Sequence, residues 1–272
     1  MKVWVDGQLT DAALARISPF DHGFTVGDGV FETCKVVAGV PFALTRHLQR
    51  LDRSAAGLGL PAPDHERVRA AIASLLEAEP DAGRLRITYT GGVSPLGSDR
   101  GDAGPTLVLA AAPEGRWETT TSVSTVPWPR NERSAVAGLK TTSYAENVVA
   151  LARAHAEGSS EAIFANTAGS LCEGTGSNIF VVVDGRLLTP PLSSGCLAGV
   201  SRELLLEWTD AEEADLPLSV LADVEEAFLS SSTRDVQSIG VVDGRVLEGA
   251  PGPVTVAAAR VFAERSVTTP DP

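Results

Sequence analysis

The sequence has few lysines, few cysteines and no long hydrophobic run, and each shortage excludes a class of protein. The 272 residues carry a net charge of −13 without any run of basic residues, so nucleic-acid binding is not expected. Three cysteines without a CxxC or zinc spacing predict neither a disulfide framework nor a metal site. No stretch approaches about 20 uninterrupted apolar residues, and residues 1–10 lack a signal-peptide core, so we expect a cytoplasmic protein without membrane contact.

The scarcity of lysine draws attention to Lys140. Only Lys2, Lys35 and Lys140 are lysines, whereas arginine fills the other basic positions. Arginine stays protonated, but a desolvated lysine becomes a nucleophilic amine that forms a Schiff base. The alternative is a lysine whose stem packs at a strand end while its ammonium stays in water. Lys140, in the small and mildly polar segment 137–144, is therefore a candidate catalytic amine.

The hydrophobic pattern predicts an α+β chain with two domains, covering residues 1–114 and 115–272, because the pattern breaks near residues 113–115. In the first domain a helix is expected from about Arg46 with Thr45 as N-cap, and a second helix after Asp64. Strands are expected there at residues 3–5, 8–9, 30–37, 40–44, 85–89 and 106–111. The Gly- and Asp-rich residues 91–104 predict a long loop.

The second domain alternates strands and helices more closely. We expect strands at residues 122–126, 161–165, 178–183, 186–189, 226–230 and 238–242. Helices are expected at residues 144–156, from about residue 199, and at residues 254–263. The sequence shows no repeat and no low-complexity segment, so both domains should fold around ordinary cores.

Glu173 is a candidate acid. It lies at an expected strand end before a glycine-bearing turn, in the segment 171–180. A carboxylate against a pyridine nitrogen keeps that nitrogen protonated, which makes pyridoxal phosphate an electron sink. The alternative is a solvated glutamate in a turn, so the meaning of Glu173 depends on its neighbours.

Three further segments are suited to an anion such as a phosphate. Residues 195–202 form a small-residue loop that enters a helix, whose first N–H groups attract anions, although ordinary helix capping explains the same pattern. Residues 230–233 are four hydroxyl residues at a strand end, which suit a phosphate contact or a polar turn. Arg50, beside an apolar helical stripe, could aim its guanidinium at a phosphate or lie on the surface.

In this order and spacing, these segments resemble the fold-type IV pyridoxal-phosphate enzymes. That class includes branched-chain aminotransferases, D-amino-acid aminotransferases and 4-amino-4-deoxychorismate lyases. The resemblance runs from residues 21–33 through residues 47–51 to the serine run, and residues 173–178 and the Lys140 segment are its most specific parts. It implies a small α+β domain, a larger pseudo-barrel domain, a homodimer, pyridoxal 5′-phosphate as cofactor and a small-molecule amine as substrate.

The resemblance also implies a role for individual residues. Lys140 matches the lysine that anchors the cofactor and then serves as general base, and Glu173 matches the acid facing the pyridine nitrogen. The residues implied at the cofactor phosphate are Arg50, Val200, Ser201 and Ser232. Tyr144 falls near the residue beside the cofactor hydroxyl, and Phe31 and Asn147 would lie near the substrate or the cofactor rim.

Departures from the family pattern bear on the reaction. D-amino-acid aminotransferases carry an arginine-glycine pair where this chain has Thr90-Gly91-Gly92, and a tyrosine where it has Phe31. Only two tyrosines are present, whereas a branched-chain enzyme is expected to line its pocket with more. The short chain, residues 47–52 and the pair Arg100-Gly101 look most like the lyase group. Arg86 or Arg100 is the candidate for binding a substrate carboxylate.

We therefore predict a 4-amino-4-deoxychorismate lyase that forms 4-aminobenzoate and pyruvate for folate biosynthesis. The first alternative is an amino-acid aminotransferase of the branched-chain or D-amino-acid type that uses 2-oxoglutarate. The second is a non-catalytic relative that acts in binding or dimerisation. The intact set of Lys140, Glu173 and Arg50 argues against this second alternative.

Overall fold

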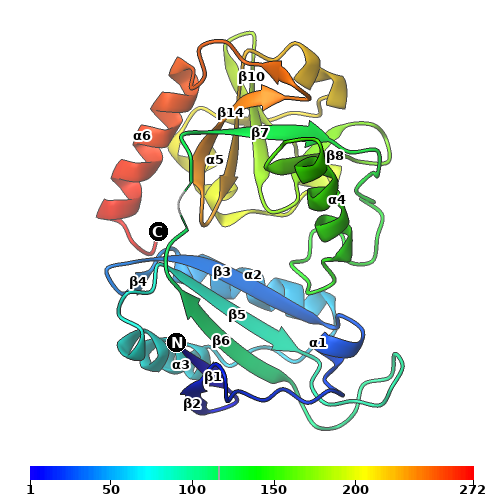
Figure 1. Ribbon diagram of the computed structural model, residues 1–272, viewed down its shortest axis with the longest axis vertical. Helices are drawn as coiled ribbons and strands as arrows, with labels where there is room; N and C mark the ends of the chain where they lie inside the picture. The colour runs from blue at the N-terminus through cyan, green and yellow to red at the C-terminus, as the bar shows by residue number, and fades with distance from the viewer. Residues whose placement is uncertain (116) are drawn as a thin grey trace. The chain divides into compact units, whose positions relative to one another are not determined.

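The computed structural model describes residues 1–115 and 117–272, which divide into two compact units, each with its own sheet and helices (Figure 1). Unit 1 contains Met1–Gly115, Leu139–Tyr144 and Pro270–Pro272. Unit 2 contains residues 117–138 and Ala145–Thr269. The chain thus has a two-domain α+β fold, and the segment with Lys140 groups with unit 1.

Unit 1 is built on a six-stranded antiparallel sheet with strand order β2-β1-β6-β5-β3-β4. Its strands are β1 (Lys2–Val5), β2 (Gln8–Asp11), β3 (Gly29–Val37), β4 (Val40–Pro41), β5 (Arg84–Thr90) and β6 (Thr106–Ala112). The β1–β2 turn places Asp6 and Gly7 at φ 43° and 101°, the positive values that match the twist of a tight hairpin. Buried and more exposed residues alternate along β6, as expected for a sheet with one covered face.

The helices of unit 1 are α1 (His22–Thr25), α2 (Leu44–Gly57) and α3 (His65–Ala78). The sheet and helices α2 and α3 share one core, in which Leu48, Leu51, Leu75 and Leu85 are fully buried. The expected start of α3 is confirmed, because Asp64 Oδ1 accepts the N–H groups of the first turn at 3.0 and 3.1 Å.

The expected N-cap of α2 is wrong. The helix begins at Leu44, and its N-cap is Ala43, which has a left-handed backbone and no capping side chain. Thr45 lies instead in the first turn, where its N–H and hydroxyl donate to the Asp271 carboxylate at 2.8 and 2.6 Å. A residue 226 positions away thus supplies the cap, which local sequence could not indicate.

Unit 2 contains a curled nine-stranded sheet. Eight of its strands follow the order β12-β11-β10-β13-β14-β7-β8-β9, and the ninth, β15, pairs with β14. Its strands are β7 (Thr120–Thr125), β8 (Glu161–Ala165), β9 (Leu171–Gly174), β10 (Asn178–Val183), β11 (Arg186–Thr189), β12 (Glu212–Glu213), β13 (Glu226–Ser231), β14 (Asp235–Val242) and β15 (Arg245–Val246). The pairs β7–β8, β7–β14 and β11–β12 are parallel and the others antiparallel. Strands β8, β10 and β13 each contain four consecutive buried residues, so helices and loops cover both faces there.

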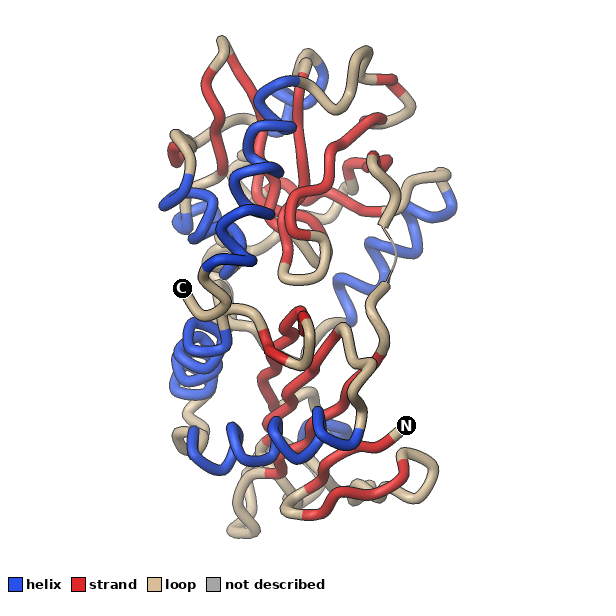
Figure 2. Tube along the Cα trace, turned by 90° about the vertical axis from the view of Figure 1, so that its left-hand side faces the viewer, coloured by secondary structure: helices blue, strands red, loops and turns tan. Residues whose placement is uncertain are grey.

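Helices α4 (Ala145–Ala156), α5 (Val200–Trp208) and α6 (Pro253–Thr268) pack against this sheet, with two 3-10 turns, η1 (Leu192–Ser194) and η2 (Leu218–Ala222), in its connections. Helix α4 lies against β7 and β8, whereas α5 and α6 pack against each other and against β13 (Figures 1 and 2). None of the helices in residues 1–115 and 117–272 combines the length and apolar character needed to cross a bilayer.

Candidate functional site

The backbone of Lys140 is attached to the sheet of unit 1. Its carbonyl accepts the N–H of Phe31 at 3.0 Å, and its own N–H donates to Ser54 Oγ of α2 at 3.1 Å. Two residues further on, the N–H of Thr142 donates to the Gly29 carbonyl at 2.8 Å. The lysine is thus held at the start of β3, although more than 100 residues separate it from that strand.

The side chain of Lys140 lies near two of the residues expected around it, Phe31 and Tyr144. Its Nζ lies 4.3 Å from the centroid of the Phe31 ring and 6.0 Å from that of Tyr144, and the two rings pack edge to face at 5.2 Å. The guanidinium of Arg86, on β5 beside β3, lies 3.7 Å from the same Phe31 centroid. One aromatic ring thus contacts both an amine and a guanidinium, an arrangement suited to an anionic amine substrate.

Arg50 is buried within unit 1, where Glu32 orients it. Glu32 Oε1 accepts from Arg50 Nε at 2.8 Å and Oε2 from Nη2 at 2.7 Å, while His47 Nδ1 lies 2.6 Å from Oε2. Burial opposes ionisation of Glu32, but the charge and hydrogen bonds of Arg50, aided by His47, hold the pKa of Glu32 well below its usual range. Sequence reasoning missed Glu32, whose only local signal was its place in a buried strand.

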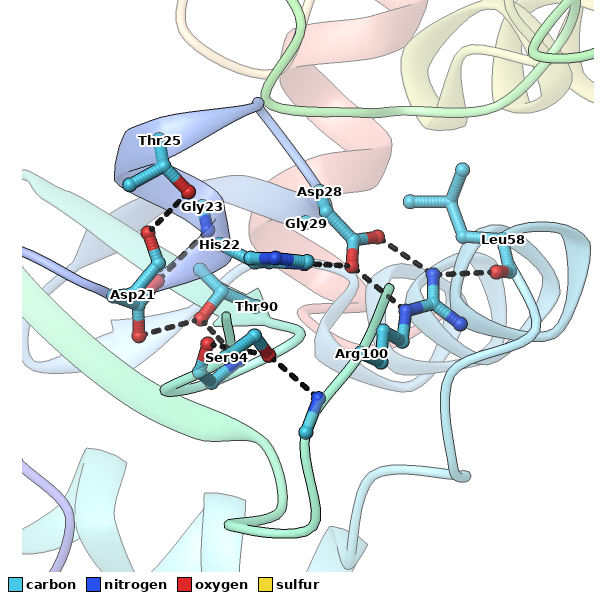
Figure 3. A network of polar contacts seen from close by, with 12 residues as sticks. Asp21, His22, Gly23, Thr25, Asp28, Gly29, Leu58, Thr90, Ser94 and Arg100 are labelled. Atoms are coloured by element: carbon cyan, nitrogen blue, oxygen red, sulfur yellow. Dashed lines mark hydrogen bonds and ion pairs between the residues drawn. The ribbon is translucent and has the colours of Figure 1, made fainter. Parts of the chain in front are cut away.

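Arg100 anchors the loop after β5 (Figure 3). Its Nε and Nη2 donate to the Asp28 carboxylate at 2.7 and 2.6 Å, and its two terminal nitrogens donate to the Gly59 and Leu58 carbonyls at 2.9 and 2.7 Å. The hydrogen bonds of Arg100 are the main cause of the lowered pKa of Asp28. Each guanidinium nitrogen therefore has a partner at the end of α2 or at Asp28.

Glu173 lies on β9 of unit 2 with both carboxylate oxygens engaged. Oε1 accepts from Arg130 Nε at 3.1 Å, and Oε2 accepts the N–H of Leu197 at 2.9 Å. Sequence reasoning missed Arg130, since it lies 43 residues before Glu173. The donor from Leu197 connects Glu173 to the loop that leads into α5.

Val200 and Ser201 are the first residues of α5, and both are buried. The N-cap residue, Gly199, provides no side-chain cap, so this helix start keeps its attraction for an anion. A side chain at position 199 would collide with Asn178, whose Nδ2 donates to the Leu197 carbonyl at 2.9 Å. Glu173 and the uncapped start of α5 therefore both adjoin the loop that contains Leu197 and Gly199.

Ser232 lies in the turn between β13 and β14, two residues after Ser230. Ser230 pairs in register with Asn178 of β10. Within the described residues, the buried Oγ of Ser230 makes no hydrogen bond. A buried hydroxyl without a partner is uncommon in folded proteins, and a bound oxyanion would satisfy it.

Asn147, the remaining candidate, is buried on α4. Its Oδ1 accepts from Arg130 Nη1 at 3.1 Å, and its Nδ2 donates to the carbonyl of Thr175. The Asn147 amide therefore helps to fix the turn after Glu173 by donating to the Thr175 carbonyl. This arrangement assigns Asn147 a contact with the protein backbone that the sequence did not indicate.

These residues fit pyridoxal 5′-phosphate. Unit 1 carries an amine beside two aromatic rings and an oriented arginine. Unit 2 carries a fixed carboxylate, an uncapped helix start and a buried hydroxyl without a partner. A lysine amine suits an aldehyde, a carboxylate suits a pyridine nitrogen, and an uncapped helix start suits a phosphate. The fold and the residues of each unit are thus those of a two-domain enzyme that uses this cofactor.

Comparison with known proteins identifies the family. Residues 29–242 match the model of the class IV amino-transferases. A bifunctional aminodeoxychorismate lyase / D-amino acid transaminase of Mycobacterium tuberculosis is 31% identical over 291 aligned residues, covering 97% of this chain and 96% of the relative. A branched-chain aminotransferase structure from Thermoproteus uzoniensis superimposes with a TM-score of 0.88 at 30% identity, covering 98% and 94% of the two chains.

A second structure has the cofactor bound. A protein of Mycobacterium tuberculosis described as a hypothetical aminotransferase, in its PLP-bound form, superimposes with a TM-score of 0.85 at 28% identity, covering 98% of this chain and 99% of that one. The chain belongs to the class IV aminotransferase family. It is an enzyme that uses pyridoxal phosphate, as an aminotransferase or a lyase, on a small-molecule amine.

Proposed function

We propose that this enzyme is a 4-amino-4-deoxychorismate lyase that releases 4-aminobenzoate and pyruvate. The observation that carries this choice is the geometry of Arg100, whose nitrogens are bonded to Asp28 and to the end of α2. The loop after β5 then has no arginine disposed like the substrate-binding arginine of D-amino-acid aminotransferases, because β5 ends in Thr90 and two glycines. Similarity to the mycobacterial relative, which is described as both an aminodeoxychorismate lyase and a D-amino acid transaminase, supports the lyase activity without excluding transamination.

In this proposal the two units contribute different functions. Bound pyridoxal phosphate supplies an electron sink that stabilises negative charge at the carbon next to the substrate amine. Lys140 is the covalent attachment point and, once the substrate amine displaces it, the base that removes the proton from that carbon. Glu173 faces the pyridine nitrogen and keeps it protonated. The phosphate is held by Arg50, Val200, Ser201 and Ser232.

Arg86 is the proposed ligand of a substrate carboxylate. It lies against Phe31, the ring that also contacts the Lys140 amine, so Arg86 and the amine share one aromatic neighbour. Tyr144, packed edge to face on Phe31, is the proposed neighbour of the cofactor hydroxyl. The lyase reaction requires only one bound orientation of the substrate. Pyruvate leaves from the ring carbon next to the one that bears the amine, and the ring becomes aromatic.

The test supplies 4-amino-4-deoxychorismate to the reconstituted enzyme and measures 4-aminobenzoate and pyruvate. Parallel reactions contain D-alanine or L-leucine with 2-oxoglutarate. We expect 4-amino-4-deoxychorismate to give equal amounts of 4-aminobenzoate and pyruvate, faster than D-alanine or L-leucine is converted to its keto acid in the parallel reactions. Lys140→Ala should give no product in any of these reactions. Keto-acid formation without 4-aminobenzoate would overturn the lyase proposal and leave an aminotransferase.

An amino-acid aminotransferase is the second candidate, because the chain is 30% identical to the Thermoproteus branched-chain enzyme over almost its full length. The same Lys140, Glu173 and Arg50 would serve, since both reactions begin with proton removal next to the amine. The parallel reactions above distinguish the two candidates directly.

We also propose that the enzyme is a homodimer. Large apolar side chains lie exposed around α1 and the start of the loop after β5, including Phe24 at 76% and Leu96 at 75% exposure. A backbone bridge between Asp21 and Val93 brings the two segments side by side. Exposed apolar side chains that cluster in this way mark contact surfaces.

Light scattering should give twice the mass of one chain. The double variant Phe24→Asp with Leu96→Asp should lower that mass toward the monomer, whereas Val267→Asp, at an exposed position of α6, should not. A monomeric native enzyme would contradict the proposal. The cytoplasmic location expected from the sequence stays a prediction.

A further inference from the structure

Both the backbone and the side chain of Arg130 contact other residues of unit 2. It lies between β7 and α4, where its N–H donates to the Ala165 carbonyl at 2.7 Å and its backbone forms an isolated parallel bridge with Asn166. Its guanidinium lies 4.2 Å from the centroid of the fully buried Phe164 ring. Backbone and ring contacts therefore hold Arg130 in addition to its hydrogen bonds.

The guanidinium then serves several acceptors at once. Nε donates to Glu173 Oε1, and Nη1 donates to Asn147 Oδ1 and to Glu146 Oε2, each at 3.1 Å. Asn147 in turn donates to the Thr175 carbonyl, two residues beyond Glu173. Arg130 therefore contacts Glu173 directly and, through Asn147, supports the turn that follows it.

The two ion pairs of Arg130 differ in their surroundings. The side chains of Arg130 and Glu173 are only 16% and 12% exposed, whereas Glu146 is 59% exposed. Water screens the outer pair, which is worth little, but it screens the inner pair much less. The ion pair between Arg130 and Glu173 is thus the one expected to affect the charge and position of Glu173. A variant of Glu146, the other carboxylate paired with Arg130, provides a matched control.

We propose that Arg130 is the positioning residue of Glu173, holding its carboxylate ionised and aimed so that the cofactor's pyridine nitrogen keeps its proton. This inference rests on the proposed role of Glu173. A proton shared between a carboxylate and a pyridine can reside on either group, and a guanidinium beside the carboxylate favours the arrangement with the proton on nitrogen. The Leu197 N–H on the other carboxylate oxygen acts in the same direction.

An arginine suits this position better than a lysine. Its planar group donates from Nε to Glu173 and from Nη1 to Asn147 at once, with a charge that it does not lose. Arg130→Lys keeps the charge but loses this planar fork, whereas Arg130→Met keeps much of the stem and loses both. The pair of variants therefore separates charge from geometry.

The test reconstitutes each variant with pyridoxal phosphate or with its N-methylated analogue, whose ring nitrogen is permanently positive. The first readout is the visible spectrum of the protein without substrate, together with the cofactor dissociation constant from tryptophan fluorescence. We expect Arg130→Met to alter the spectrum with pyridoxal phosphate but not with the analogue. Turnover should fall about 10- to 100-fold with the natural cofactor, and the analogue should relieve most of that loss.

Arg130→Lys should retain a larger part of the native behaviour, and it serves as the test if Arg130→Met does not fold. Glu146→Gln should behave like the native enzyme. Native behaviour of Arg130→Met, or an equal defect with both cofactors, would overturn the inference.

Glu173→Gln is the reference variant. If it is impaired while the Arg130 variants are native, Arg130 is not the positioning residue, and if it too is native, the assignment of Glu173 fails as well. The spectra need no substrate, so the outcome does not depend on whether the enzyme is a lyase or an aminotransferase.

Discussion

Glu32 and Arg50 form a two-point ion pair inside unit 1, with Oε1–Nε and Oε2–Nη2 distances of 2.8 and 2.7 Å. Glu32 is fully buried and Arg50 almost so. Two points of contact prevent the guanidinium from rotating about its long side chain. The pair therefore makes the orientation of Arg50, the proposed phosphate ligand, a property of the protein rather than of the bound cofactor.

Replacing Glu32 should be costly. In Glu32→Gln, the buried charge of Arg50 loses the Glu32 carboxylate, and breaking a buried pair in this way costs about 3–5 kcal/mol. The free energy of unfolding of the cofactor-free protein, from a urea titration, should fall by that amount, and the affinity for pyridoxal phosphate should fall with it. The exposed Glu77 on α3 provides the control Glu77→Gln. A loss no larger than that of the control would contradict the structural role of Glu32.

We expect the buried group of Glu32, His47 and Arg50 to make the protein less stable in acid. Burial lowers the pKa of His47, and Arg50 lowers that of Glu32, so both groups bind fewer protons when folded than when unfolded. Stability then rises with pH where the unfolded chain holds more protons. It should begin to fall as pH drops below about 6.5, the usual value for His47, and fall further below about 4.5, the usual value for Glu32.

Unfolding titrations between pH 7 and 5 isolate the histidine term. In His47→Gln the slope of unfolding free energy against pH should be shallower in this interval, whatever the change in its absolute value. His155→Gln, at an exposed position of α4, should keep the native slope. An unchanged slope in His47→Gln would show that His47 is not held neutral.

Asp271 should stabilise α2 as a cap. The helix has no side-chain cap of its own, and the Asp271 carboxylate accepts both the N–H and the hydroxyl of Thr45. Asp271→Ala should lower the free energy of unfolding by about 0.5–2 kcal/mol, the usual cost of losing such a cap. Asp271→Asn retains a side-chain oxygen acceptor and should lose less. Equal stability of native protein and Asp271→Ala in thermal unfolding would exclude this role.

Arg86 and Arg100 should respond differently to substitution. A charge-assisted hydrogen bond to a substrate carboxylate is worth about 1.5–3 kcal/mol, so Arg86→Met should lower kcat/KM about 10- to 100-fold with little change in stability. Arg100→Met removes the contacts to Asp28, Leu58 and Gly59 and should lower the melting temperature.

The control for both substitutions is Arg260→Met, since Arg260 is largely exposed on α6. It should change neither kcat/KM nor the melting temperature. A larger kinetic loss in Arg100→Met than in Arg86→Met would reverse the assignment of the carboxylate ligand.

Local patterns predicted most elements of the fold. Strands at residues 161–165, 178–183 and 186–189 lie where the apolar runs indicated, and α3 begins after its Asp64 cap. The short α1 and β12 were not expected as separate elements, because four or fewer residues carry too little periodicity to be recognised. Thr45 was wrongly expected to cap α2 because the true cap is distant.

The residues of the candidate site also divide into those that the sequence indicated and those that only the structure revealed. The rarity of lysine pointed to Lys140, and the structure places Phe31 and Tyr144 beside its amine and Arg86 against the Phe31 ring. Nothing near Glu173 in the sequence pointed to Arg130, and nothing near Arg50 required Glu32 as its partner. Their roles at the cofactor stay predictions until the variants above are measured.

By itself, the sequence determined where strands and helices form and which residue types are available for chemistry, since hydrophobic period, turn residues and caps act within a few positions. The tertiary structure decided which of those residues meet. Arg130 and Glu173 are 43 residues apart, and Thr45 and Asp271 are 226 apart. Such pairs depend on sheet register and helix packing, which bring the side chains to 3.1 and 2.6 Å without leaving a local trace in the sequence.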